Sequence, residues 1–217
     1  DDFDGRLSIS LRAGTNLMAI ETAEWQRLEA AIIKSINNEA KALDDEERIF
    51  LRFNETQRLQ MWDGRQWDGE DEILKKVKDL PLDAILEWYR NDLQYPSVML
   101  LDDQHVRLDD ADRRGATTRD AMMWHLRNFA RLKVDDCPSA SRKTVIISGS
   151  WISAIREVKH EIIKMEMPLP DDTVIKKVLN QVASSRNLSS SQISNSSELV
   201  NAALGLTVME AESAFNH

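Results

Sequence analysis

The segment that most constrains the fold is a short apolar run that ends in two adjacent carboxylates. Four apolar residues run from Val98 to Leu101, and Asp102 and Asp103 come directly after them. A short apolar run bounded by polar residues is typical of a strand buried on both faces, as in a parallel sheet covered by helices. Carboxylates just past the carboxyl end of such a strand lie where open α/β sheets bind ligands. The sequence therefore predicts a ligand site at this edge of a sheet.

The rest of the chain alternates between strand and helix patterns. Strands are predicted at residues 17–20, 48–53, 97–101, 144–148 and 162–167, a hairpin at 60–67, and helices at 25–37, 82–89, 122–129 and just after residue 150. Residues 1–15 are interpreted as a polar lead-in with a short apolar patch. This order favours an α/β fold with a mostly parallel sheet and right-handed crossovers.

The chain beyond residue 170 shows helical patterns and no strand pattern. Asp172 is placed to cap a helix that runs to about residue 182, and eight serines between Ser184 and Ser197 predict a loop. Two short helical patterns follow around Gly205. We therefore expect two domains, an α/β core of residues 1–170 and a small helical subdomain of residues 171–217.

Charge and composition restrict the function classes. The formal net charge of −9 disfavours a broad nucleic-acid or anionic-membrane surface, although a local basic patch remains compatible with it. Cys137 is the single cysteine, which excludes an internal disulfide and disfavours a structural zinc site. No apolar run approaches the roughly 18 to 20 residues that span a bilayer, and the first residues do not have the pattern of a signal peptide. A cytoplasmic location without a membrane partner is the default expectation.

Five segments, taken together and in order, resemble a known family. They are Leu17–Thr22 with Glu24 and Arg27, Val98–His105, Lys143–Ser148, Met167–Asp171, and Leu204–Thr207 with Glu210–Glu212. This set resembles an AAA+ ATPase core followed by its helical lid. It is most similar to the N-terminal half of the AAA+ proteins first named as a hypothetical open reading frame of algal chloroplasts and cyanobacteria.

The resemblance implies a fold, and it places ATP binding in another domain of the protein. The fold would be a mostly parallel, five-stranded RecA/AAA+-like sheet flanked by helices, with residues 171–217 as the lid. ATP and Mg²⁺ would belong to the family's catalytic domain further along the chain, and no cofactor is expected in this segment. A plastid-encoded member would lie in the chloroplast stroma instead of the cytoplasm.

The phosphate loop of an active nucleotide hydrolase is missing from the sequence. That loop needs the pattern G-x-x-x-x-G-K-S/T, because backbone amides wrap the phosphate and a lysine meets its charge. None of the seven glycines is followed by lysine, and Glu21-Thr22-Ala23-Glu24 stands where the resemblance places the loop. Two carboxylates there would repel a triphosphate. We therefore expect no ATP hydrolysis by the usual route, and we assign no catalytic residue.

The acidic pair would be a remnant of the family's site. By the resemblance, Asp102, Asp103 and Gln104 occupy the Walker B position, with Gln104 in place of the glutamate that polarises water, and an amide is a poor base. Asp102 and Asp103 are candidate Mg²⁺ ligands, and the alternative is a solvated acidic loop. The candidate residues of a degenerate nucleotide site are Glu21, Thr22, Ser148 and Ser150.

One concentration of basic residues is a candidate partner surface. It consists of Arg113, Arg114, Arg119, Arg127 and Arg131. These side chains would meet the acidic face of a neighbouring subunit or nucleic acid, and the alternative is a solvated helix face. His125 lies on the apolar stripe of the same helix and is interpreted as a satisfied core histidine rather than a metal ligand.

The leading functional hypothesis is a non-catalytic AAA+-like domain that serves assembly or partner recognition within a larger AAA+ ATPase. Its partners would be other proteins or the neighbouring subunits of a ring. One alternative is an active ATP hydrolase with an atypical phosphate site. Another is a subunit of a DNA-processing ATPase complex that uses the arginine-rich helix.

Overall fold

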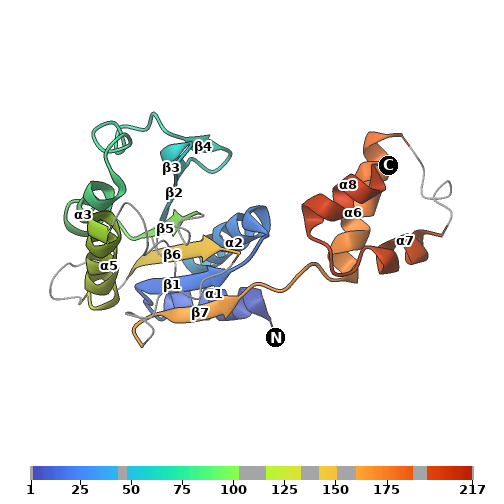
Figure 1. Cartoon of the computed structure of the whole chain (residues 1–217), viewed down its shortest axis with the longest axis horizontal. Coiled ribbons are helices and arrows are strands. Elements are labelled where there is room, and N and C mark those ends of the chain that lie inside the picture. Colours follow the sequence, from blue (N-terminus) through green and yellow to red (C-terminus); the bar gives the residue numbers. More distant parts are fainter. Residues whose placement is uncertain are drawn as a thin grey trace. The chain divides into compact units, whose positions relative to one another are not determined.

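The computed structural model describes residues 2–43, 48–102, 116–132, 142–150, 160–187 and 195–216, without the side chains of residues 42, 43 and 116–119. The chain divides into two compact units, Asp1–Glu166 and Met167–His217 (Figure 1). Within the described residues, no helix has the length and apolar character needed to cross a membrane.

The first unit is built on a seven-stranded sheet with the strand order β4-β3-β2-β5-β6-β1-β7. The strands are β1 (Leu17–Glu21), β2 (Ile49–Asn54), β3 (Arg58–Trp62), β4 (Trp67–Asp68), β5 (Ser97–Leu101), β6 (Lys143–Gly149) and β7 (Ile163–Glu166). The strands β2, β5, β6, β1 and β7 pair in parallel, while β3 and β4 add an antiparallel hairpin. The mostly parallel α/β sheet is therefore confirmed. The predicted count of five strands was too low, because β3 of the hairpin pairs with the open edge of β2 and so extends the sheet.

Helices cover the two faces of this sheet. They are α1 (Phe3–Arg12), α2 (Trp25–Leu43), α3 (Leu82–Asn91) and α5 (Ala116–Ala130). Helix α1 packs against α2, and α3 packs against α5 (Figure 1). Side chains at alternate strand positions, among them Met99 and Leu101, pack with α3 and α5 in one core. Every residue of β5 and β6 is buried, which explains the unbroken apolar run of β5.

Residues 1–15 are not a polar lead-in, because most of them form helix α1. Phe3, Leu7 and Leu11 are buried at helical spacing, and Lys34 on α2 contacts Asp4 at 2.7 Å. Polar residues between the buried positions concealed this stripe in the sequence. The helix expected just after residue 150 lies outside the described residues.

A buried ion pair connects three elements of the first unit at the amino ends of the parallel strands. The guanidinium of Arg48, which precedes β2, donates to both carboxylate oxygens of Glu39 on α2, at 2.9 and 3.0 Å. It also donates to the carbonyls of Leu11 at 2.7 Å and Arg142 at 2.8 Å. The charge is thus paired and hydrogen-bonded, as burial requires.

In its described residues the second unit consists of the helices α6 (Asp172–Ser185), α7 (Ser196–Ala202) and α8 (Val208–Phe215). Its small core includes Ile175, Leu179 and Val200. The cap of α6 is Asp171, which accepts from the Val174 amide at 2.9 Å, and not Asp172, which is the first residue of the helix. The role of this second unit as a lid stays a prediction.

Candidate functional site

The candidate site lies where parallel strands end beside the start of α2. Asp102 directly follows β5, β6 ends at Gly149, and β1 ends at Glu21, with three residues between it and the start of α2 at Trp25. These three strands are parallel neighbours, so their carboxyl ends meet at one edge of the sheet. Residues far apart in the sequence converge there for this reason.

A pocket of about 340 Å³ at this edge gathers most of the predicted site. Its described lining is Thr22, Ala23, Trp25, Asp102, Ser148, Gly149 and Ser150. The Ser148 hydroxyl donates to Asp102 Oδ1 at 3.1 Å. The structure therefore brings Asp102, Thr22, Ser148 and Ser150 together, whereas Glu21 is half-buried at the end of β1 and does not line this pocket.

The connection between β1 and α2 is short and bonded to its own surroundings. The Thr22 amide donates to the Gly149 carbonyl at 2.8 Å, and the Thr22 hydroxyl accepts from the Glu24 amide at 2.8 Å. Glu24 is buried and lies 3.7 Å from Arg27. Two of the three amides in this connection thus have acceptors within the protein.

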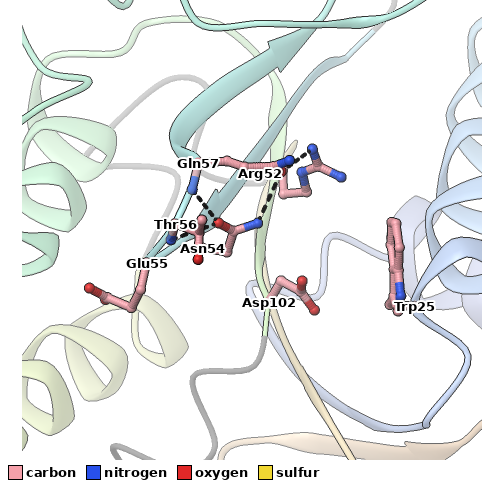
Figure 2. A pocket seen from close by; sticks show the side chains of 7 residues that line it. All are labelled: Trp25, Arg52, Asn54, Glu55, Thr56, Gln57 and Asp102. Atoms are coloured by element: carbon pink, nitrogen blue, oxygen red, sulfur yellow. Dashed lines mark hydrogen bonds between the residues drawn. The ribbon is translucent and has the colours of Figure 1, made fainter.

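A second pocket, of about 370 Å³, shares Trp25 and Asp102 with the first (Figure 2). The turn between β2 and β3 forms its other wall. Asn54 Oδ1 accepts from the amides of Thr56 at 3.1 Å and Gln57 at 2.6 Å, and Asn54 Nδ2 donates to Gln57 Oε1 at 3.2 Å. The turn is therefore held by its own side chains, as is common for asparagine.

Arg52 fixes this turn to α2. It is only 6% exposed, and it donates to Glu29 Oε1 at 2.5 Å, Gln57 Oε1 at 2.8 Å and Gln60 Oε1 at 2.7 Å. The guanidinium lies 4.3 Å from the ring centre of Trp67, whose indole N–H donates to Glu29 at 3.3 Å. Burial raises the pKa of Glu29, and Arg52 opposes that rise. The positive charge of Arg52 is therefore balanced by Glu29 within the wall of the pocket.

Reasoning from the sequence did not single out Arg52 and Asn54, and it placed Trp25 only at the start of a predicted helix, residues 25–37. A signal was present for Arg52, because a cation within a central strand is rarely buried unless it is paired. No comparable signal marks Trp25, which is 39% exposed at the rim of both pockets.

The other predicted residues are only partly described. Arg127 and Arg131 are exposed, and Arg131 pairs with Glu161 at 2.6 Å, so part of the basic concentration is neutralised. The side chains of Asp103, Gln104, Arg113, Arg114, Arg119 and Cys137 lie outside the described residues. The Mg²⁺ site at Asp102 and Asp103 stays a prediction, and the described residues contain no group of three or more metal-ligating side chains.

His125 is buried on α5, as expected, with 7% of its surface exposed. It is not a fully satisfied histidine, because its Nδ1 has no hydrogen-bond partner among the described residues. Its ring and that of Trp124 form a T-shaped pair, with centroids 5.0 Å apart. Burial lowers the pKa of His125, so the neutral imidazole is favoured.

Residues 3–167 match the family model described as SpoVK-like AAA ATPase, N-terminal domain. The chain belongs to this family. The match covers the whole α/β unit, and it does not show the narrower relationship to chloroplast and cyanobacterial proteins, which stays a prediction. A comparison with curated protein sequences finds no match.

Solved AAA structures share the fold of this SpoVK-like N-terminal domain. A chain of the E. coli MS115-1 HORMA:CdnC:Trip13 complex matches with a TM-score of 0.54 and 12% identity, over 100% of this chain and 87% of that one. A chain from a study of katanin self-assembly matches with a TM-score of 0.53 and 13% identity, over 96% of this chain and 65% of that one. At such low identity these likenesses show the AAA+ type of fold alone.

Proposed function

We propose that this chain is a non-catalytic AAA+-like domain that serves assembly or partner recognition within a larger AAA ATPase. The observation that carries the proposal is the three-residue connection between β1 and α2. A phosphate loop of about eight residues must point several free amides at one phosphate group. Here the amides of Thr22 and Glu24 already have acceptors within the protein, which leaves few donors for a phosphate.

The charges at this edge also support the proposal. Asp102 lines both pockets, so a carboxylate lies at the edge of the sheet where a triphosphate would have to bind, and Glu21, which ends β1, adds a negative charge at that edge without lining either pocket. A pair of like charges about 4 Å apart costs about 4 kcal/mol at an effective dielectric constant of about 20. Among the described lining residues the one cation is Arg52, and its charge is balanced by Glu29. The site therefore disfavours a triphosphate electrostatically.

The structural neighbours are consistent with a role in assembly. The Trip13 structure is that of a HORMA:CdnC:Trip13 complex, and the katanin structure concerns katanin self-assembly. Those statements concern those proteins, and for this chain an oligomer or a protein partner remains our proposal. A cytoplasmic location likewise remains an expectation.

Isothermal titration of the full chain with MgATP tests the proposal. We expect no binding heat at micromolar nucleotide, because the amide cradle and its lysine are missing. A micromolar Kd would contradict the proposal. ATP turnover that is lost in Asp102→Ala and kept in Asp120→Asn, an exposed acid on α5, would support the alternative of an active hydrolase with an atypical phosphate site.

A further inference from the structure

We propose that a groove at the start of β2 binds an apolar side chain of a partner protein that is flanked by lysine or arginine. The groove has a volume of about 270 Å³, and residues of α2, of β2 and of the hairpin line it. We call it the Ile33–Trp62 groove, after one residue from each of its two walls. The inference rests on the proposed role in partner recognition and specifies the chemistry of the partner.

The groove is separate from the candidate site. Arg48 and Ile49 line it at the start of β2, whereas the candidate site lies at the carboxyl ends of β1, β5 and β6. Among the described lining residues, none of the groove also lines either pocket of the candidate site. A ligand can therefore occupy the groove without contacting the acidic edge.

Most of the described lining is apolar. Ile33 and Ile36 belong to α2, Phe50 belongs to β2, and Met61 and Trp62 belong to the hairpin. Ile33, Met61 and Trp62 are only half-buried, so this apolar surface is open to a ligand. Aromatic residues and methionine are enriched where proteins bind one another. A cavity of about 150 Å³ with apolar walls holds a benzene molecule, so the groove has room for one large apolar side chain such as phenylalanine.

The hairpin wall is held in place before any partner arrives. The ring of Trp62 forms a T-shaped pair with that of Trp67, with centroids 5.5 Å apart. Asp63 Oδ1 accepts from the amides of Arg65 and Gln66, both at 2.7 Å, and this fixes the turn of the hairpin. A wall that is already ordered reduces the ordering cost of binding.

Arg48 does not make the groove attractive to an anion. A guanidinium has five N–H groups, and all five of Arg48 donate within the protein, two of them to the carboxylate of Glu39. Its side chain is only 1% exposed. The charge of Arg48 is therefore balanced by Glu39, and no donor remains for a ligand.

Asp63 places a negative charge at the exposed rim of the groove. Hydrogen bonds from the amides of Gln66 and Arg65 lower the pKa of Asp63, so the carboxylate is ionised at neutral pH. The Arg65 side chain also favours the ionised form, but it does not line the groove and forms no ion pair with Asp63 among the described residues. Four consecutive acids, residues 44–47, directly precede Arg48 in the sequence. Complementarity therefore favours positive charges beside the apolar side chain of the partner.

The test uses the full chain and three short peptides. They are acetyl-Lys-Ala-Phe-Ala-Lys-amide, the same peptide with alanine in place of phenylalanine, and acetyl-Glu-Ala-Phe-Ala-Glu-amide. Binding is followed by NMR through the indole N–H signal of Trp62, which is assigned with Trp62→Phe. We expect a saturable shift with the first peptide. Loss of the phenyl ring should weaken binding at least tenfold, and reversal of the charges should weaken it at least threefold.

Two internal controls accompany these titrations. The indole signals of Trp25 and Trp124, which are 39% and 57% exposed, should not move, because neither residue lines the groove. Salt at about 0.3 M should reduce the difference between the lysine and glutamate peptides, because it screens exposed charges.

Two variants probe the rim charge and the apolar wall. Asp63→Asn keeps the oxygen that fixes the turn, and it should weaken the lysine peptide about threefold. Asp92→Asn, at an exposed acid after α3, should change nothing. Ile33→Gln should weaken both phenylalanine peptides at least threefold, because it makes the wall polar. Ile9→Gln is its control, since Ile9 is 60% exposed on α1 and does not line the groove.

Four results would overturn the inference. They are the absence of a saturable shift with the lysine–phenylalanine peptide, equal binding of the alanine peptide, equal or tighter binding of the glutamate peptide, and unchanged binding in Ile33→Gln. A Trp62 shift that follows protein concentration without any peptide would also overturn it, because a second copy would then be the occupant. The peptide comparison uses the unaltered chain, so it decides even if a variant fails to fold.

A parallel MgATP titration separates the two proposals. If neither ATP nor the lysine–phenylalanine peptide binds, the proposed function stands and this inference fails. ATP binding counts against the proposed function itself, whatever the peptides do.

Discussion

Replacing Arg48 with methionine should strongly destabilise the first unit. The side chains of Arg48 and Glu39 are only 1% and 3% exposed, so the substitution leaves a buried carboxylate without its main partner. The nearest remaining cation is Arg142, whose Nε lies 3.8 Å from Glu39. Breaking a buried pair from one side costs about 3 to 5 kcal/mol. For a protein of this size that loss corresponds to a fall in Tm of about 6 to 20 °C.

Urea unfolding followed by tryptophan fluorescence measures this loss. All six tryptophans lie between residues 25 and 151, so their signal reports the first unit alone. Lys34→Met is the control, because Lys34 and Asp4 form an exposed pair, with 64% and 42% of their side chains accessible, that should contribute at most about 1 kcal/mol. The double variant Arg48→Met with Glu39→Met should recover most of the loss. The reasoning is refuted if Arg48→Met costs less than about 1 kcal/mol, or if the double variant is less stable than the single one.

Two further predictions concern titration and capping. Burial lowers the pKa of His125, so the unfolded chain takes up the proton first and the free energy of unfolding should fall as the pH drops below about 6.5. Between pH 7.5 and 5.5 the urea midpoint of His125→Leu should depend less on pH than that of the unaltered chain. Equal slopes of midpoint against pH in the two proteins would contradict this. The Thr207 hydroxyl and the Glu210 carboxylate cap α8 reciprocally, so Thr207→Ala should destabilise that helix by about 1 kcal/mol while Thr207→Ser should not. Amide hydrogen exchange in α8 measures the effect, and unchanged protection in Thr207→Ala would exclude it.

Local patterns in the sequence were sufficient for the central strands. The apolar run of β5 and the similar run of β6 show that both faces are covered, because such runs occur where helices pack on each side. The same logic places Asp102 at the ligand-binding edge, since carboxylates cannot continue a buried strand without a partner. The hairpin was also predictable, and Gly64 has the positive φ angle that its turn requires.

Long-range contacts decided what the sequence could not show. Helix α1 has only a narrow buried stripe, so its existence depends on packing against α2. Arg52 is stable inside β2 only because Glu29, 23 residues earlier, Gln57 in the turn after β2 and Gln60 on β3 surround it.

By itself, the sequence determined the fold class, the acidic edge and the lack of a phosphate-loop motif, because periodicity, charge and motif spacing are properties of neighbouring residues. Only the tertiary structure decided that Trp25, at the start of α2, lines the same pockets as Asp102, which follows β5. The parallel crossovers of the sheet bring those two chain positions to one edge, and no local pattern encodes that proximity.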